Sequence, residues 1–218
     1  MADANIQEMT SDELVLAGFG SLGRGKPAMA AKGAASNEIG ADRFRRQMLE
    51  RLNMLPRNVQ KALQTRKAQI SDAPYYATAP IAGTRAELIK LSQSEQIGVT
   101  NIDNGKLNKD RYLVLSGLRL LFDATAIDGA FTDVFPADLM NGEWEVELNG
   151  RKVFEKMPIR RFHDGFVGYN VDKPFGLYVL SNPKTVEPQT PIEFNVDLPN
   201  AVAGFLKIEL IGTTVYGF

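Results

Sequence analysis

The chain has no cysteine and only one histidine, His163, among its 218 residues. The absence of cysteine excludes disulfide scaffolds, Cys-ligated zinc and iron–sulfur sites, and thiol catalysis. One histidine leaves no multi-His metal site. We therefore expect the protein to use neither a metal nor a cofactor.

Long apolar runs are also missing from the sequence. The longest early run, residues 14–20, is far shorter than the ~20 residues that a membrane-spanning helix needs. The polar, acidic start MADANIQEMTSDE does not match the basic start of a signal peptide. These absences predict a soluble protein with few options for side-chain chemistry.

The charges are balanced only on average. Hydrophobic residues make up 44% of the chain, which is enough to fill a core, and the net charge is −1. Residues 1–23 hold four acids and no base, residues 24–67 hold eleven bases and three acids, and residues 68–218 hold fourteen bases and nineteen acids. This order predicts a basic arm that meets something the acidic body does not.

The first third of the chain reads as an arm. Residues 17–41 are rich in Ala and Gly and predict a flexible stretch. Apolar residues then recur at helical spacing and predict a helix stripe that contacts neighbouring subunits: Phe44, Met48, Leu52, Leu55, Val59 and Leu63. Pro56 is expected to divide this helix, and residues 72–80 to form a proline-rich linker. We place the arm at residues 1–81 and a second domain at 82–218.

Beyond Ala82 the apolar residues alternate with a period of two, which is typical of strands. Strands are predicted at residues 87–92, 111–122, 175–181, 192–198 and 205–216, and a hairpin at 143–157. In the hairpin, Asn149-Gly150 suits a type I′ turn. That turn would pair Val146 with Val153, Glu147 with Lys152, and Glu143 with Lys156.

The predicted strands define a mainly β fold. They cover about 135 residues without a convincing helix between them, which indicates an antiparallel two-sheet sandwich. Several connections run to about 15–20 residues, too long for an up-and-down meander, so a jelly roll is expected after the amino-terminal arm and its amphipathic helix.

Two phosphate-binding patterns overlap near the start. Residues 18–23 match G-x-G-x-x-G, and residues 20–26 match the beginning of a P-loop. No parallel strand follows the first pattern, and Pro27 occupies the place of the magnesium-binding Ser or Thr of the second. A glycine-rich arm is therefore the favoured interpretation.

Other catalytic patterns are weak, and we expect no catalytic residue. His163-Asp164 has no accompanying nucleophile elbow and is interpreted as a surface loop. Glu143, Glu145 and Glu147 share one strand face at a spacing that permits a glycosidase pair, but the hairpin gives two of them lysine partners. The segment from Asp123 to Gly129 lacks the spacing of an EF-hand calcium loop.

The basic segment is the strongest functional feature. Its cations are candidates for contact with nucleic-acid phosphates or anionic lipid: Arg43, Arg45, Arg46, Arg51, Arg57, Lys61, Arg66 and Lys67. The alternative is that the segment only packs on another subunit or domain, with its cations in solvent.

A basic, Ala/Gly-rich arm followed by one β domain resembles viral jelly-roll capsid proteins. The resemblance is carried by residues 43–67, by Ile97-Gly-Val-Thr-Asn-Ile-Asp103, by the strand at 111–122 and by the closing residues 205–218. The resemblance implies a virion structural protein of a bacteriophage. Copies of this protein would assemble into a shell in the host cytoplasm. Its partners would be copies of itself, other virion proteins, and genome or internal membrane lipid at the arm.

A carbohydrate-binding or adhesin-like sandwich is the alternative function. It would stack sugar on Trp144, Tyr112 or Tyr169. Trp144 alternates with Glu143 and Glu145, however, so we expect its ring to point into the core.

Overall fold

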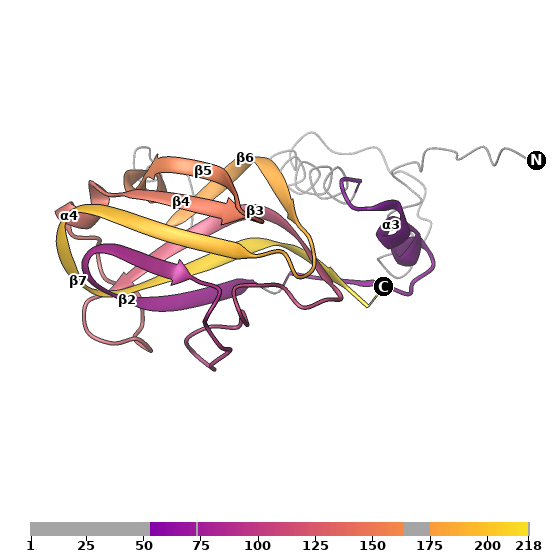
Figure 1. Cartoon of the computed structure of the whole chain (residues 1–218), viewed down its shortest axis with the longest axis horizontal. Coiled ribbons are helices and arrows are strands. Elements are labelled where there is room, and N and C mark those ends of the chain that lie inside the picture. Colours follow the sequence, from indigo (N-terminus) through magenta and orange to yellow (C-terminus); the bar gives the residue numbers. More distant parts are fainter. Residues whose placement is uncertain (1–52, 73, 164–174, 218) are drawn as a thin grey trace, which may run out of the picture. The chain divides into compact units, whose positions relative to one another are not determined.

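The structure is a computed structural model of the whole chain, and it describes residues 53–72, 74–163 and 175–217 (Figure 1). The chain divides into two units. One comprises Met1–Ser71 with Val215–Phe218, and the other comprises Asp72–Thr214. Predicted features within residues 1–52 and 164–174 lie outside the described residues, including the glycine-rich stretch and Asp164.

In the amino-terminal unit, the described residues form one helix and one short strand. Helix α3 spans Arg57–Gln64 and follows Pro56, so the helix predicted after this proline is confirmed. Strand β1, Gln69–Ser71, pairs with β7, whose Tyr216 hydroxyl donates a hydrogen bond to Gln69 Oε1 at 2.9 Å.

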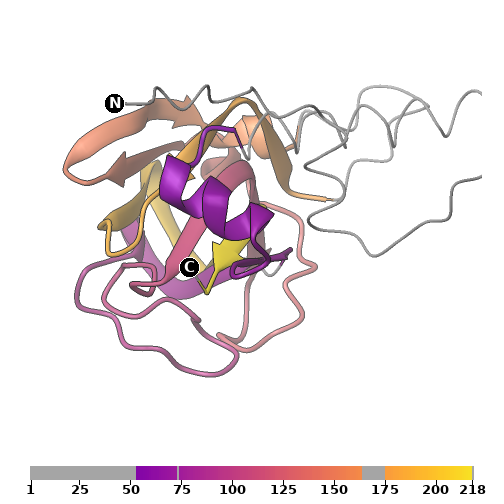
Figure 2. The ribbon, with the colours of Figure 1, turned by 90° about the vertical axis from the view of Figure 1, so that its right-hand side faces the viewer.

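The Asp72–Thr214 unit is built from strands, which confirms the mainly β prediction. The strands are β2 Tyr75–Ile89, β3 Arg111–Asp123, β4 Glu143–Leu148, β5 Arg151–Pro158, β6 Leu177–Val186 and β7 Ile192–Tyr216. Two short helices, α4 Ala137–Met140 and the 3₁₀-helix η1 Ile159–Phe162, lie in the connections. The strand order is β5-β4-β7-β3-β6, with β2 also paired to β7, and the antiparallel sheet curls on itself (Figure 2).

The long strands β2 and β7 pair in two separate stretches. Residues 75–83 of β2 pair with residues 202–210 of β7, and the register then shifts so that Arg85 faces Asp197. Residues 198–201 therefore bulge out of β7 opposite Thr84. We call residues 192–197 the first stretch of β7 and the residues from 202 onward its second stretch; residues 75–83 and 85–89 are the first and second stretches of β2. The first stretch of β7 also pairs with β4. In the second stretch, Ile211 O accepts a hydrogen bond from Ser116 Oγ of β3 at 3.1 Å.

The predicted linker at 72–80 is wrong from Tyr75 onward, and the predicted domain boundary at Ala82 is wrong as well. Residues 75–89 form one continuous strand, so that boundary falls inside β2. Pro80 is tolerated because β2 pairs with only one sheet strand, β7, and a proline on an edge strand need not donate to a ladder. The strands predicted at 192–198 and 205–216 likewise merge into β7.

The hairpin β4–β5 is confirmed, although its register is only partly as predicted. Asn149 and Gly150 both have positive φ, 51° and 71°, as a type I′ turn requires. Glu147 faces Lys152 as expected. Farther from the turn the register shifts, so that Val146 faces Phe154 instead of Val153, and Glu143 faces Pro158 instead of Lys156.

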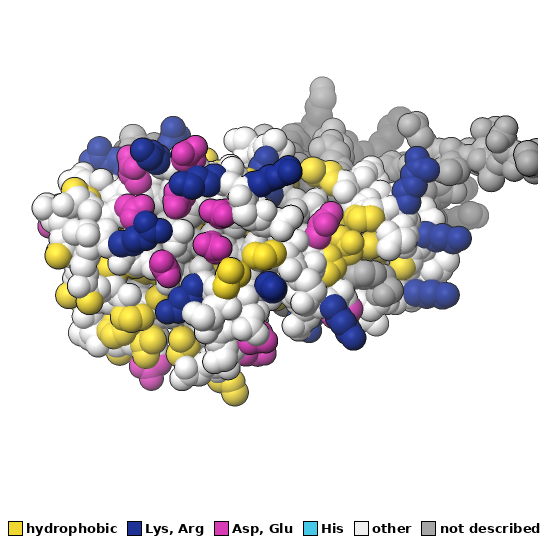
Figure 3. Space-filling view, viewed as in Figure 1, with side chains coloured by type: hydrophobic (Ala, Val, Ile, Leu, Met, Phe, Trp, Pro, Cys, Tyr) yellow, Lys and Arg dark blue, Asp and Glu magenta, His cyan; other side chains and the backbone are white. Residues whose placement is uncertain are grey.

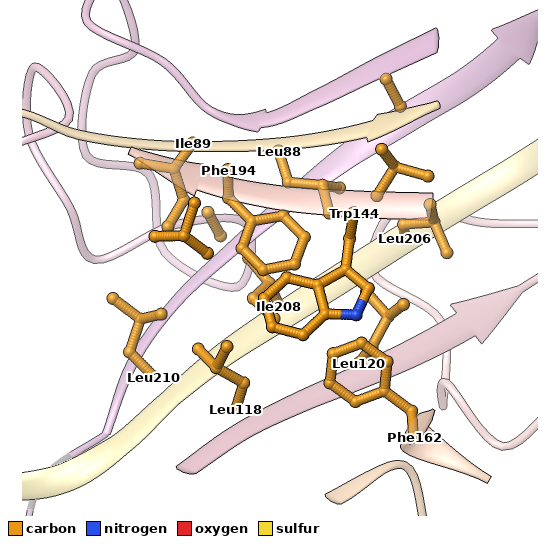
Figure 4. Close-up of a cluster of buried hydrophobic side chains, with 14 of the residues drawn as sticks. Leu88, Ile89, Leu118, Leu120, Trp144, Phe162, Phe194, Leu206, Ile208 and Leu210 are labelled. Carbon is orange, nitrogen blue, oxygen red and sulfur yellow. The ribbon is translucent and has the colours of Figure 1, made fainter. Parts of the chain in front are cut away.

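The core is centred on Trp144, whose side chain is fully buried as predicted (Figure 4). Its indole ring stacks on Phe194 at a centroid distance of 5.6 Å and an interplanar angle of 4°. Phe162 lies 5.4 Å away, and aliphatic side chains from β2, β3 and β7 surround the pair. Alternate residues of four strands thus meet in one interior, because each strand places every second side chain on the same face.

Candidate interaction surfaces

The predicted apolar stripe is buried where the structure describes it. Leu55, Val59 and Leu63 are 3%, 0% and 7% exposed, whereas Phe44, Met48 and Leu52 lie outside the described residues. Side chains that are already buried have little apolar area left to bury against a neighbouring subunit. Contact of this stripe with a neighbour stays a prediction, and the exposed side of α3 is the part available to a partner.

The turn that precedes α3 is held by a side chain of the helix. Gln60 Nε2 donates hydrogen bonds to the carbonyl oxygens of Asn53 at 3.0 Å and Leu55 at 2.7 Å. These carbonyl groups precede the helix and accept none of its backbone hydrogen bonds. The side chain of Gln60 therefore closes the turn and fixes where α3 begins.

The carboxyl end of α3 is a Schellman motif. Arg66 N donates to Leu63 O at 3.1 Å, and Lys67 N donates to Ala62 O at 2.9 Å. Arg66 occupies the left-handed position of this motif, with φ of 56°, where glycine is usual. The arginine carries a backbone cost there, but it keeps a cation at the negative end of the helix dipole.

The exposed side of α3 and the turn after it carry a basic surface, which we define as Arg57, Lys61, Arg66 and Lys67. All four side chains are exposed, and residues 53–71 contain no acidic residue. Arg57, Lys61 and Lys67 form no ion pair with a described carboxylate. The other predicted contact cations, Arg43, Arg45, Arg46 and Arg51, lie outside the described residues.

Strands β4 and β7 place acidic residues opposite one another on the outer side of the sheet. Glu143 faces Asp197 and Glu147 faces Glu193 across the ladder. We define these four residues as the acidic face. All four are exposed or half-exposed, while Trp144 and Val146 between them point into the core. Figure 3 shows the mixture of acidic and basic side chains over β4, β5 and β7.

The middle of this face is neutralised within the chain. Lys152 Nζ donates to Glu145 Oε2 at 2.8 Å, and Asn195 Nδ2 approaches Glu145 Oε1 at 3.5 Å. The hydrogen bond from Lys152 lowers the pKa of Glu145. A general acid needs a raised pKa, so the lowered pKa disfavours Glu145 as the acid of a carboxylate pair.

Two other residues singled out from the sequence, His163 and Trp144, pack against aromatic rings. His163 is half-buried, with its ring 4.5 Å from Phe135 and 5.2 Å from Phe175 in edge-on contacts. Trp144 is fully buried, so its ring is not available to stack on a sugar. Tyr112 is half-buried, and Tyr169 lies outside the described residues.

The segment from Asp123 to Gly129 is organised by its first carboxylate. Asp123 accepts hydrogen bonds from Thr125 N and Oγ1 at 2.8 Å, from Ala126 N at 3.0 Å and from Phe131 N at 3.3 Å. These bonds lower the pKa of Asp123 to about 2, and the bonds from Ala126 and Thr125 have the largest effect. The carboxylate therefore holds the loop by accepting these four hydrogen bonds.

One shallow pocket of about 290 Å³ lies between loops of the Asp72–Thr214 unit. It is lined by Leu91, Asp103, Asn104, Lys106, Leu107, Asn108 and Gln189. No group of three His, Asp or Glu side chains among the described residues is arranged to hold a metal. No helix in the described ranges is long and apolar enough to span a membrane.

No protein-family model and no curated protein matches this chain.

The acidic face was not predicted from the sequence, because Glu193 and Asp197 lie some fifty residues from their partners and no local pattern predicts the β4–β7 pairing. The only signal was the acidic alternation in each strand taken separately.

Proposed function

We propose that the Asp72–Thr214 unit is a jelly roll and that the chain is a virion structural protein, a capsid subunit that self-assembles into a shell. In this proposal the chain is not an enzyme. Its amino-terminal unit faces neighbouring subunits or the virion interior, which holds genome or membrane lipid. The proposal rests on the strand pairing and on the charge of the amino-terminal unit.

The nested pairing of the strands is the observation that carries the proposal. When β2 is divided at Thr84 and β7 at residues 198–201, the sheet consists of eight segments. The first pairs with the eighth and the second with the seventh. The third, β3, pairs with the sixth, β6, and the fourth, β4, pairs with the fifth, β5. A chain doubled into one long hairpin and then rolled up gives this order, which is that of the eight-stranded jelly roll.

The further contacts between segments support two four-stranded sheets. β4 pairs with the first stretch of β7, and β3 lies beside the second stretch. One sheet would then run from β5 through β4 and β7 to the second stretch of β2. The other would run from β6 through β3 and β7 to the first stretch of β2. Trp144 and Phe194 of the first sheet face Leu120 and Leu206 of the second in the shared core (Figure 4).

Jelly rolls serve as capsid, lectin and cupin domains, so the fold alone does not choose among them. Cupin chemistry needs a cluster of metal ligands, and the chain has one histidine. A lectin commonly stacks sugar on an exposed aromatic side chain, and Trp144, one of the three candidates for that role, is buried. The separate basic amino-terminal unit favours the capsid function, because a cationic arm serves contacts outside the β domain.

A deletion of residues 1–71 tests the proposal. The cut lies before β2, so the core strands remain, and the pairing of β1 with β7 is lost. We expect residues 72–218 to give the β-rich circular dichroism of the full chain but to remain small in light scattering, while the full chain forms particles. Normal particles from the deleted chain would refute the role of the amino-terminal unit.

A further inference from the structure

The acidic face carries like charges that the described residues balance only in part. Like charges directly opposite one another in an antiparallel ladder are destabilising, and this face has two such pairs, Glu143 with Asp197 and Glu147 with Glu193. Glu143, Glu147 and Glu193 form no ion pair within 4 Å of a described cation, and the cation that faces Glu147 across the β4–β5 ladder, Lys152, is ion-paired with Glu145. Arg85 reaches Asp197 at 3.8 Å, but both side chains are more than half exposed, so this ion pair is weak.

The basic surface is the electrostatic counterpart of this face. Residues 53–71 hold four cations and no acid, whereas the described residues from 72 to 214 hold thirteen bases against seventeen acids. We propose that the basic surface of one copy of the chain docks on the acidic face of a second copy. The inference rests on the proposed self-association and names the surfaces that carry it.

The spacing of the charges fits this docking. Glu143 and Glu147 are four strand residues apart, which corresponds to about 14 Å. Arg57 begins α3 and Lys67 follows its end; the seven helical steps from Arg57 to Gln64 span about 10 Å, and the three residues after the helix add at most about 10 Å. One cation at each end of the basic surface can therefore reach one acidic pair each. Between the two pairs, the carboxylate of Glu145 is already ion-paired with Lys152 at 2.8 Å.

A second copy fits these observations better than nucleic acid or lipid does. An anionic polymer or membrane would neutralise the basic surface, but it would leave the like-charged pairs on the sheet unrelieved and would be repelled by them. Another copy supplies cations to the acidic face and acids to the basic surface in equal number. Because the two surfaces differ, the contact is heterologous and can continue from copy to copy until a ring closes.

Charge reversal on the full chain tests this docking. The first variant combines Lys61→Glu with Lys67→Glu, and the second combines Glu143→Lys with Glu147→Lys. Matched controls reverse the same number of exposed charges elsewhere: Lys90→Glu with Lys109→Glu, and Glu95→Lys with Asp128→Lys. Association is measured by sedimentation velocity at low and at high salt, with circular dichroism to verify folding.

We expect each surface variant alone to weaken self-association about tenfold or more, because attractive contacts become repulsive, while the controls associate like the unchanged chain. An equimolar mixture of the two variants should regain association, since each supplies the charge that the other lacks. Unchanged association in the Glu143/Glu147 variant would overturn the proposal. So would a mixture that fails to associate, or a Lys61/Lys67 variant that loses only binding to DNA or to anionic vesicles.

These results are distinguishable from failure of the proposed function. Shells that form equally well with both reversals would leave the capsid function standing and remove the docking. Salt-sensitive association that follows the charge swap, but never yields rings or shells, would support the docking and contradict the capsid function.

Discussion

Replacing Trp144 by alanine tests how far one aromatic stack supports the β domain. The side chain is fully buried, with Phe154 and Phe162 each 5.4 Å away and Tyr178 5.8 Å away. Truncation of such a residue costs about 3–5 kcal/mol, through lost burial and the cavity left behind. In a chain of this size that lowers Tm by about 6–20 °C.

Replacing Trp144 by phenylalanine is the matched control. Phenylalanine keeps a ring stacked on Phe194, and it removes the indole Nε1, a buried donor without a hydrogen-bond partner among the described residues. Loss of an unpaired donor offsets part of the lost packing, so we expect a cost of about 1–2 kcal/mol.

Urea unfolding of the full chain, followed by far-ultraviolet circular dichroism, measures both costs. Trp144 is the sole tryptophan, so fluorescence of the unchanged protein reports on the same core. An alanine variant that loses less than about 1 kcal/mol would refute the packing described here. A phenylalanine variant as unstable as the alanine variant would refute the reasoning about the unpaired donor.

Two further predictions concern Asp123 and Arg66. The hydrogen bonds to Asp123 lower its pKa from 3.8 to about 2, so the ionised carboxylate stabilises the folded chain above about pH 4, and this contribution is lost as the pH falls toward 2. Asp123→Asn should therefore lower Tm at pH 7 more than at pH 3; an equal loss at both would contradict the assignment. Arg66→Gly should stabilise the end of α3 by about 1 kcal/mol relative to Arg66→Ala, because only glycine adopts φ of 56° without strain. Hydrogen exchange of the α3 amides measures this difference, and equal protection in the two variants would refute it.

The elements predicted correctly from the sequence are those specified by neighbouring residues. The period of two in residues 111–122 gives β3, and Asn149-Gly150 sets the hairpin turn because few other residue pairs adopt positive φ at both positions. The burial of Trp144 follows from its alternation with Glu143 and Glu145. In each case a short stretch of chain contains all the information.

The errors arise where distant residues decide the structure. Pro74 and Pro80 indicated a linker, but pairing with β7 draws residues 75–83 into a strand that tolerates a proline at its edge. The register beyond Glu147 shifts, because Phe154 and Met157 pair with core-facing residues of β4, and Lys156 takes a positive φ of 48°. Packing against the opposite side of the core, which no local pattern encodes, sets these positions.

The candidate surfaces were predictable in part. The basic residues stand out in the sequence as a segment with few acids, and their exposure on α3 follows from the buried positions of Val59 and Leu63. The acidic face requires the pairing of β4 with β7, which brings Glu147 to Glu193 over a separation of 46 residues. That pairing depends on the fold of the whole unit and has no signal in either strand alone.

Electron microscopy of the purified full chain at high concentration and low salt, with light scattering of the same sample, tests the central claim most directly. We expect rings or closed shells, each built from many copies of the chain. A monodisperse monomer under these conditions would contradict it.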